Sequence, residues 1–558
     1  MNSIRRRFQP SVHAPGWQLL AAIGVIVAIV AVAWFAVGSS LTGSGEDAPK
    51  GYREAVVGAP SRINPLFAYM NDTDRDLSAL IFSGLTRLSQ DGEVLPDLAE
   101  SWQTSADGRS VTFTLRQGIV WHTGAPFTAS DVIFTYNLLA DRNLEADPDQ
   151  APLWRQVHCN DPNELTVICD LPSSFAPFLA FTTIGIVPRH ILEGTDAKSL
   201  SDNPFNQNPI GTGPYRLAQL DETRAVLKAN TSYHLGSPGV AEIEIGFYPD
   251  SPSAAAGVIS GDTDGLLLDP ATARPETEEL SSTQGLKVYS VNRTAYTVLY
   301  LNNTAAPLNE KPVRKAIAGA IDLESLIGEV LGGAATAASS PMVPGTWAFN
   351  PETRPYEHDE GAARDLLEEA GWKMPDDGDV RQKGDVELRI SLVTDQDPIR
   401  GALADGIAGQ LSNIGIATTV VREDSTDLVK DYLIPRQYQA AIFGWDPGPD
   451  PDPYPAWHSS QATDNGRNIA GYQSDDADRL MEQARRTFDL NERQSLYYTF
   501  QQVFHDDVPS IVLYYPVYTY FASEDVKGIE LGTLFNTGSR FRNVNEWRLE
   551  DAPSIGEG

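Results

Sequence analysis

Apolar residues recur with two different periods along the chain, and each period predicts one kind of secondary structure. Between 111 and 115 every second residue is apolar, which is the pattern of a half-buried strand. Thr128 and Asp131 then form a capping-box sequence ahead of an apolar stripe that reaches Leu139, so a helix is predicted to begin there. The first half of the chain therefore combines strands with helices.

The second half repeats a strand, helix, strand order. Asp359 can cap a helix that Gly371 ends, because glycine readily adopts the left-handed conformation of a helix stop. Strand patterns at 388–393 and 416–421 enclose a helical pattern from about 400 to 413, which predicts a right-handed crossover between parallel strands. Further elements are predicted as a strand at 439–443, helices at 474–488 and 492–505, and a strand at 510–515. Together they predict an α/β lobe that is large enough to form its own domain.

One apolar run stands apart from this pattern. Residues 19–37 carry no charge, follow Arg5, Arg6 and Arg7, and as a helix would measure about 28 Å, close to the hydrocarbon thickness of a bilayer. Because positive residues stay on the cytoplasmic side, the run predicts a single-pass membrane anchor with the large domain outside the cytoplasm. A cleaved secretory signal ending at Ala36-Val37-Gly38 is the alternative, although its apolar region is usually shorter. Both interpretations export the large domain.

Composition and charge narrow the class of protein. The chain has 558 residues, of which 41% are hydrophobic, so it can bury a large core and is expected to form more than one domain. Its 75 acidic and 42 basic residues give a formal charge of −33, which repels nucleic acid and anionic lipid headgroups. Nucleic-acid binding is therefore excluded, and a folded exoprotein is predicted.

The chain has two cysteines, Cys159 and Cys169, which flank the turn-forming cluster Asn160-Asp161-Pro162-Asn163 in a predicted hairpin. In an oxidising compartment a disulfide across this hairpin is favoured over two buried free thiols. Neither cysteine lies just after the apolar run, which excludes a lipid-modified N-terminal cysteine. With only His158 beside them, the two do not provide the four ligands of a zinc site.

A search for catalytic motifs finds none of the common patterns. The chain lacks a His-Glu-x-x-His zinc motif, a Gly-x-Ser-x-Gly nucleophile elbow and a P-loop, and its eight histidines show no metal-ligand spacing. Gly211-Thr212-Gly213 resembles part of a dinucleotide loop, but Pro214 removes an amide that a phosphate would need, so a tight turn between domains is predicted instead. We therefore expect no enzyme activity, no cofactor and no bound metal.

A set of ordered motifs carries a family resemblance. They are IFSGLTRL (81–88), LPDLAESW (95–102), FTLRQG (113–118), WHTGAPFTASDV (121–132), PIGTGPY (209–215), VRKAI (313–317), AID (320–322) and AARDLLEEAGW (362–372), with Asn468 and Tyr472. In this order they resemble the family 5 extracellular solute-binding proteins, which are the peptide, nickel and related receptors of ABC importers. The resemblance covers about 52–522.

The resemblance implies an α/β fold with a type II periplasmic-binding-protein-like clamp of two lobes, together with an additional domain. The apolar run adds the predicted N-terminal transmembrane helix. The solute would close the lobes around it by binding the closed form more tightly. By analogy with the family, lobe I consists of 52–88, 213–299 and 515–550, the additional domain of 89–212 and lobe II of 300–514. The sequence itself predicts a cytoplasmic N-terminus (1–16), an anchor (17–38), a linker (39–51) and a tail (551–558).

The best candidate for the solute site is the acidic, proline-rich segment GWDPGPDPDPY at 444–454, which resembles the family's Gly-Trp followed by Asp-Pro. A peptide amine needs a carboxylate in a dry, fixed position, because this pairing is strong only when it is desolvated. The resemblance assigns that role to Asp450, with Asp446 and Asp452 as register alternatives, and makes Trp445 an apolar wall. The alternating prolines stiffen the loop and leave the register open. A solvated acidic loop and a calcium site are the alternatives.

Two further residues are weaker candidates. Arg400 matches, after a shift, an arginine that dipeptide-type relatives place ahead of the corresponding helix to bind the solute's carboxylate. A surface arginine at the helix start is the alternative. Tyr69 follows Asn64-Pro65-Leu66 and can reach the cleft from lobe I, although an exposed loop tyrosine is equally consistent with the sequence.

These observations predict a monomeric, membrane-tethered receptor that captures a peptide or similar oligomeric solute and delivers it to an ABC permease and ATPase complex. Binding of a nickel chelate or an oligosaccharide in the same fold remains an alternative, because a fold does not select its ligand. A sensor that passes lobe closure to a signalling partner is an alternative from another class, and a secreted hydrolase is a third.

Overall fold

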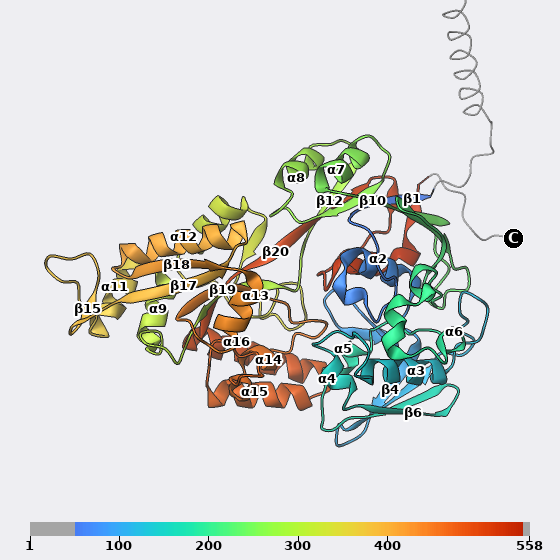
Figure 1. Cartoon of the computed structure of the whole chain (residues 1–558), viewed down its shortest axis with the longest axis horizontal. Coiled ribbons are helices and arrows are strands. Elements are labelled where there is room, and N and C mark those ends of the chain that lie inside the picture. The colour runs from blue at the N-terminus through green and yellow to red at the C-terminus, as the bar shows by residue number, and fades with distance from the viewer. Residues whose placement is uncertain (1–50, 551–558) are drawn as a thin grey trace, which may run out of the picture. The chain divides into compact units, whose positions relative to one another are not determined.

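One long strand, β20 (Ser510–Ser523), runs through both parts of a twelve-stranded sheet in residues 51–550, the part of the chain that the computed structural model describes (Figure 1). Its first residues pair with β13 (Tyr296–Leu301) and its last residues pair with β12 (Leu286–Asn292). Because β12 and β13 are consecutive, the chain passes between the two parts at 293–295 and again near 516. We call the part that contains β12 lobe I and the part that contains β13 lobe II. The two-lobed α/β fold is confirmed.

Lobe II contains the strand, helix, strand unit that the sequence predicted. Its strand order is β18-β17-β19-β13-β20, and the short strand β14 (Ala335–Ala337) also pairs with β20. β17 (Arg389–Asp395) lies parallel to β18 (Ala417–Glu423), and α12 (Pro398–Asn413) connects them. β19 (Ala440–Trp445) lies parallel to β17 on its other side. Lobe II also carries the hairpin β15 (Gln382–Lys383) and β16 (Val386–Glu387).

Helices cover both faces of the lobe II sheet and form two separate apolar cores. The first core includes α9 (Lys311–Ala320), α10 (Leu323–Leu326), η4 (Ile327–Leu331), α11 (Glu360–Glu369) and α12. The second includes η5 (Leu428–Leu433), α14 (Tyr454–Trp457), α15 (Asp475–Arg486) and α16 (Leu490–Asp507). α11 begins as predicted, since Asp359 accepts a hydrogen bond from the amide of Ala362 at 2.9 Å and Gly371 follows the helix with φ +87°.

Lobe I is a mixed sheet with the order β20-β11-β1-β10-β9-β8. Its strands are β1 (Tyr52–Val57), β8 (Tyr215–Leu220), β9 (Arg224–Ala229), β10 (Glu242–Tyr248) and β11 (Gly265–Leu268). α7 (Ser251–Ile259) and α8 (Arg274–Ser281) form a small core on one face. On the other face lie η1 (Ala68–Met70), α2 (Asp72–Ile81), η7 (Thr537–Phe541) and η8 (Val544–Glu546).

The C-terminal stretch joins lobe I through a buried ion-pair network. Arg540 in η7 donates to Glu54 in β1 at 2.6 Å and to both carboxylate oxygens of Asp76 in α2 at 2.7 and 2.8 Å. A short hairpin, β21 (Val526–Lys527) with β22 (Arg548–Leu549), closes the same stretch. Segments from both ends of the described chain therefore build one lobe.

Residues between α2 and β8 form a four-stranded antiparallel sheet of order β4-β5-β7-β6. It consists of β4 (Ala99–Thr104), β5 (Ser110–Leu115), β6 (His158–Asn163) and β7 (Thr166–Asp170), and α3 (Ala129–Ala140) lies against β6 and β7. The same region contains β2 (Thr86–Leu88), β3 (Val94–Pro96), α4 (Ala151–Trp154), α5 (Phe178–Phe181), α6 (Arg189–Leu192), η2 (Ala197–Asp202) and η3 (Pro204–Gln207). The capping box of α3 is confirmed, since Asp131 accepts from the amide of Thr128 at 3.0 Å.

Cys159 and Cys169 form a disulfide between opposite residues of β6 and β7. The turn of this hairpin lies at Glu164 and Leu165, however, and not at the predicted cluster 160–163, which belongs to β6. An irregularity in the pairing between Asn160 and Asn163 accommodates the proline of that cluster, because proline has no amide to donate to the ladder.

The turn Gly211-Thr212-Gly213 packs directly on the end of α2. A side chain at position 211 would place its Cβ 1.8 Å from the carbonyl oxygen of Ile81, so only glycine fits there. His122 holds the turn, since its Nδ1 accepts from the amide of Gly211 at 3.3 Å and its Nε2 lies 3.1 Å from the carbonyl oxygen of Gly213. Burial lowers the pKa of His122 to about 4, so this histidine is neutral in the folded protein.

The predicted membrane anchor at 17–38 lies outside the described residues. Within 51–550, no helix combines the length and the hydropathy that a membrane span requires.

Candidate functional site

The acidic, proline-rich loop connects the end of β19 to α14 in lobe II. Its three aspartates differ in exposure: Asp450 and Asp452 are buried, whereas 45% of the side chain of Asp446 is exposed. Exposure decides their possible roles, because a solute can reach only a carboxylate that faces solvent.

Asp450, the predicted amine-binding residue, faces into lobe II. Its two carboxylate oxygens accept hydrogen bonds from Arg493 in α16 at 2.5 and 2.8 Å. Burial raises the pKa of Asp450 and the guanidinium of Arg493 opposes that rise. The structure thus differs from the predicted role: Asp450 anchors the loop to α16 and presents no free oxygen to a solute.

Asp452 anchors the same loop to α15. One of its oxygens accepts from Arg485 Nε at 2.6 Å and the other accepts from the amide of Tyr454 at 3.1 Å. The guanidinium of Arg485 also lies over the ring of Tyr454, 3.7 Å from its centroid. Asp452 is therefore a second internal support and not an exposed register alternative.

Asp446 and Trp445 lie where β19 ends, at the edge of lobe II that borders lobe I. Trp445 is half-buried and packs on the second core of lobe II. One oxygen of Asp446 accepts from the amide of Gly448 at 2.9 Å, and the other lies 3.4 Å from Nη2 of Arg293, which belongs to the crossing between the lobes. Among the three aspartates, Asp446 is the one that presents a carboxylate at this boundary.

Arg400 is already paired within lobe II. Its Nε and Nη2 donate to the two carboxylate oxygens of Asp395 at 2.8 and 2.7 Å, and its guanidinium lies over the ring of Phe443. Hydrogen bonds from Arg400 lower the pKa of Asp395 against the effect of burial. The predicted carboxylate-binding arginine is thus the counter-ion of a buried aspartate.

Tyr69 is hydrogen-bonded to the segment after α3 and not to the acidic loop. Its hydroxyl donates to the carbonyl oxygen of Glu145 at 3.2 Å, which links η1 of lobe I to the segment after α3. Burial raises the pKa of Tyr69, and Asp147 and Glu145 add to that rise. In the structure, Tyr69 thus joins η1 to the segment that follows α3.

Sequence reasoning missed a group of charged and phenolic side chains at the crossing between the lobes. Arg293 donates to the hydroxyl of Tyr518 in β20 at 3.3 Å. Asp269, which follows β11, raises the pKa of Tyr518 together with burial, and Arg293 opposes the burial-driven rise in the pKa of Asp269. Burial lowers the pKa of Arg293, and the charges of Asp446 and Asp72 oppose this effect by raising it. The boundary therefore combines carboxylates with a cation.

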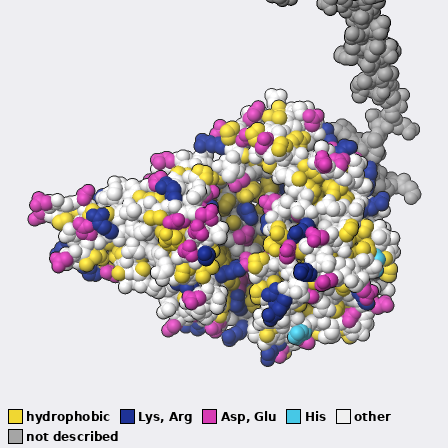
Figure 2. Space-filling model, viewed as in Figure 1, with side chains coloured by type: hydrophobic (Ala, Val, Ile, Leu, Met, Phe, Trp, Pro, Cys, Tyr) yellow, Lys and Arg dark blue, Asp and Glu magenta, His cyan; other side chains and the backbone are white. Residues whose placement is uncertain are grey.

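A signal for this group was present in the sequence. Arg293 lies between two strand patterns, close to the predicted lobe boundary at 299. A charged residue between two strands at a lobe boundary is a candidate for a position in the cleft. Figure 2 shows Lys and Arg side chains gathered where the surface is hollowed between the two lobes.

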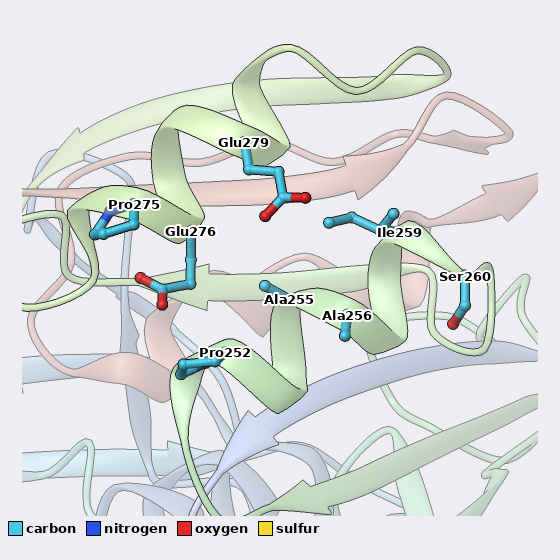
Figure 3. A pocket seen from close by; sticks show the side chains of 8 residues that line it. All are labelled: Pro252, Ala255, Ala256, Ile259, Ser260, Pro275, Glu276 and Glu279. Atoms are coloured by element: carbon cyan, nitrogen blue, oxygen red, sulfur yellow. The ribbon is translucent and has the colours of Figure 1, made fainter.

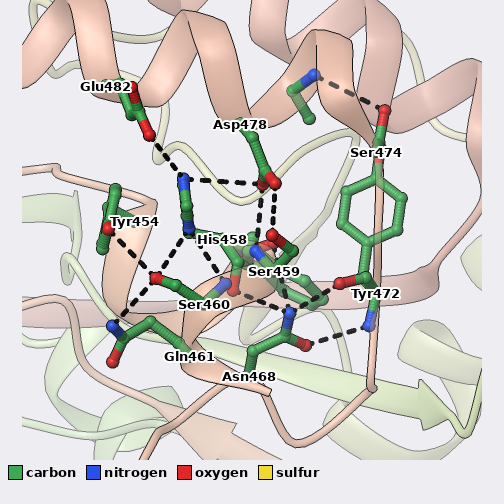
Figure 4. Close-up of polar contacts among 12 residues, drawn as sticks. Tyr454, His458, Ser459, Ser460, Gln461, Asn468, Tyr472, Ser474, Asp478 and Glu482 are labelled. Carbon is green, nitrogen blue, oxygen red and sulfur yellow. Dashed lines mark hydrogen bonds and ion pairs between the residues drawn. The ribbon is translucent and has the colours of Figure 1, made fainter.

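A serine, a histidine and two acids lie together behind the loop and resemble the components of a hydrolase site (Figure 4). His458 Nε2 lies 3.5 Å from Glu482 and 3.8 Å from Asp478. Its Nδ1 accepts from the amide of Ser460 at 3.1 Å and so caps the turn that begins at Ser459, and the Ser460 hydroxyl lies 2.8 Å from the same nitrogen. These contacts hold together the turn that follows α14.

Asn468 fastens the end of this loop (Figure 4). Its side-chain amide donates to the carbonyl oxygens of Tyr472 and His458 at 2.8 and 3.0 Å, and its oxygen accepts from the amide of Tyr472 at 3.1 Å. Asn468 is buried and its side chain is fully hydrogen-bonded within the protein, so this motif residue stabilises the local fold.

A separate groove of about 310 Å³ lies between α7 and α8 in lobe I (Figure 3). Its walls are small or apolar residues together with Glu276 and Glu279. No basic side chain lines it, so it lacks the pairing of opposite charges found at the lobe boundary. Within residues 51–550, no group of three or more His, Cys, Asp or Glu side chains is arranged to hold a metal ion.

Comparison with known proteins now decides the family. The family model described as bacterial extracellular solute-binding proteins, family 5 Middle, matches residues 93–467. The chain belongs to this family. Family 5 membership, the two lobes and the motifs from 81 to 472 are therefore consistent with one another.

Individual members are similar over most of their length. The oligopeptide-binding protein AppA of Bacillus subtilis is 27% identical over 88% of this chain and 90% of its own. The structure of AppA in complex with a nonapeptide superposes with a TM-score of 0.66 and 25% identity, covering 90% of this chain and 100% of AppA. NikZ from Campylobacter jejuni in complex with Ni(L-His) gives a TM-score of 0.68 at 28% identity, covering 89% of this chain and 99% of NikZ.

Family 5 membership establishes the class of activity. The chain is an extracytoplasmic solute-binding receptor of an ABC importer, and it is not an enzyme.

Proposed function

We propose that this receptor captures a peptide or similar oligomeric solute between its lobes, with the solute's amine bound by Asp446. The observation that supports this role is the exposed carboxylate of Asp446 at the end of β19, facing Arg293 across the lobe boundary. Asp450 and Asp452 hold the loop in place through Arg493 and Arg485. Trp445 forms the apolar wall beside the carboxylate.

Stabilising contacts around Asp446 favour this assignment. The loop is held at two points by charge-assisted hydrogen bonds of 2.5–2.8 Å, so its position changes little when a solute arrives. A carboxylate that is held in place before binding loses little conformational entropy on pairing with an amine. Lobe closure then removes water and strengthens the pairing.

The division of the chain in this proposal follows the predicted boundaries except at the two crossings between the lobes. Lobe I consists of 52–88, 213–292 and 517–550, lobe II of 296–515, and the additional domain of 89–212. Residues 17–38 anchor the receptor in the membrane, with 1–16 in the cytoplasm, 39–51 as a linker and 551–558 as a tail. The anchor keeps the receptor close to its permease, which raises the effective concentration of one for the other.

Native mass spectrometry of the full chain in detergent tests this function. A mixed tripeptide library should give complexes whose added mass equals that of an unmodified peptide. In addition, a peptide at 100 times its dissociation constant should raise the free energy of unfolding by about 2.7 kcal/mol. Absence of any complex, or recovery of cleaved peptides, contradicts the proposal.

Similarity to NikZ supports a nickel chelate as a second candidate solute. In that case the chelator supplies the metal's ligands, and the receptor binds the charged groups of the chelator. Nickel with L-histidine, added in place of the peptides, distinguishes the two candidates in the same experiment.

A further inference from the structure

Arg293 occupies a fixed position between the lobes. It follows β12 directly, and its amide N–H donates to the carbonyl oxygen of Pro516 in β20 at 3.0 Å. On the other side its backbone forms a bridge with Leu534 of lobe I. Backbone contacts therefore hold Arg293 on both sides, through β20 and through the segment at Leu534.

The guanidinium of Arg293 is only partly used. Its contacts with Tyr518 and Asp446 measure 3.3 and 3.4 Å, and its Nε is buried without a partner. Arg540, a fully buried arginine of lobe I, makes four hydrogen bonds of 2.6–2.8 Å by contrast. Since 26% of the Arg293 side chain is exposed, unused hydrogen-bonding capacity faces the boundary between the lobes.

The carboxylate of Asp446, like the guanidinium of Arg293, has few hydrogen-bond partners. Apart from the 2.9 Å bond from Gly448 to its other oxygen, its partner is Arg293 at 3.4 Å. Long, partly exposed ion pairs of this kind contribute little to stability, so a ligand can replace them at low cost. Arg400, by contrast, is occupied by Asp395 at 2.7 and 2.8 Å.

We propose that Arg293 is the anion-binding residue of this receptor and that its solute is a zwitterion. The solute's carboxylate pairs with the guanidinium of Arg293 while its ammonium pairs with Asp446, so one loose internal pair is replaced by two pairs with the ligand. This inference rests on the proposed function of Asp446. The planar guanidinium suits a carboxylate because it can donate two parallel hydrogen bonds.

The position of Arg293 links solute charge to lobe closure. Asp446 belongs to lobe II, and Tyr518, which contacts Arg293, lies in the part of β20 that pairs with β12 of lobe I. A solute that binds both charges therefore contacts both lobes and binds the closed form more tightly.

Three tripeptide libraries of the same composition test the inference: free acids, C-terminal amides, and N-acetylated acids. We expect the wild-type full chain to bind the acids about 10- to 100-fold more tightly than the amides, as a charge-assisted hydrogen-bonded pair implies. R293Q should lose this preference and keep the preference for a free amine. D446N should show the reverse. R389Q is the matched control, because Arg389 also carries one charge but 61% of its side chain is exposed.

Equal binding of acids and amides by the wild type, or a full acid preference in R293Q, overturns the anion-binding role and leaves peptide capture intact. Failure of the wild type to bind any library contradicts the proposed function, and the zwitterion inference fails with it. R293K retains the charge without the planar fork, so its acid preference should be intermediate, which also provides a test if R293Q does not fold.

Discussion

At the scale of single residues, the aspartates of the acidic loop divide between structural support and, as we propose, solute binding. Asp450 is buried against Arg493, and Asp446 is exposed at the lobe boundary. The same side-chain type therefore serves two purposes within five positions, and the neighbours decide which one.

Substitution by asparagine separates these purposes. D450N leaves the buried guanidinium of Arg493 without its counter-ion, so the free energy of unfolding should fall by about 3 to 5 kcal/mol. D446N removes an exposed charge, so stability should change by less than about 0.5 kcal/mol while peptide affinity falls. Urea denaturation and peptide titration of both variants measure the two effects. Equal loss of stability in both contradicts this division.

His122 gives the folded protein a defined dependence on pH. Its pKa is about 4 in the folded state against 6.5 in an unfolded chain, so the unfolded state binds more protons between these values. Stability should therefore decrease as the pH is lowered from 6.5 to 4, by about 3 kcal/mol from this group.

Thermal unfolding of H122Q across this pH range isolates the contribution. Glutamine keeps one donor and one acceptor for Gly211 and Gly213, so stability at pH 7 should be nearly retained while the pH dependence becomes weaker. H158Q is the control, because His158 is exposed. An unchanged pH dependence in H122Q means that His122 does not titrate as described.

At the scale of elements, local signals predicted helices better than strands. The Asp359 cap and the Gly371 stop define α11, because both act within one turn of the helix. The predicted end of β20 at Tyr515 was wrong, since the strand continues through Pro516 to Ser523. Proline is tolerated there because the pairing partner of β20 changes from β13 to β12 at this point, and Pro516 still accepts from Arg293.

Part of the proposed site could be located from the sequence for similar reasons. Trp445 ends a recognisable strand and Asp446 follows it, so their place could be read from the sequence. The partner of Asp450 lies 43 residues away in α16, and no local pattern encodes that pairing. Arg293 was missed because its contacts with Asp446 and Pro516 arise where the chain crosses between the lobes, and both partners are distant in the sequence.

The disulfide should stabilise the hairpin of β6 and β7 locally. It closes a loop with a sequence separation of 10, for which loop-closure entropy gives about 2 to 3 kcal/mol. Hydrogen exchange of these strands should therefore be faster in the double variant C159S/C169S, with strands of lobe II as an internal control. Unchanged exchange in β6 and β7 would show that the sheet holds the hairpin without the bond.

At the scale of the whole described chain, the segment after β7, which belongs to the proposed additional domain, contacts lobe II directly. The amide of Ala176 donates to the carbonyl oxygen of Arg485 at 2.7 Å, and the guanidinium of Arg485 lies 5.2 Å from the ring centroid of Phe175. Arg485 also donates to Asp452 of the acidic loop. One residue of lobe II therefore contacts both the acidic loop and the segment at 175–176.

F175A should weaken this contact and favour the open form. Loss of one partly exposed cation–π contact lowers peptide affinity by about two- to five-fold, because closure becomes less favourable. V386A is the control, since Val386 is an exposed apolar residue in the hairpin β15–β16. Calorimetric titration with the free-acid library measures both variants, and equal affinities would contradict a role for Phe175 in closure.

The central claim is that the two lobes close around an unaltered solute. Its most direct test is the distance between spin labels at E193C, directly after α6, and K430C in η5, two exposed positions in the proposed additional domain and in lobe II. We predict that a saturating free-acid tripeptide library shortens and narrows the distance distribution, and that the released peptides keep their original masses. A distribution that does not change at saturation, or peptides that are recovered cleaved, would contradict the account.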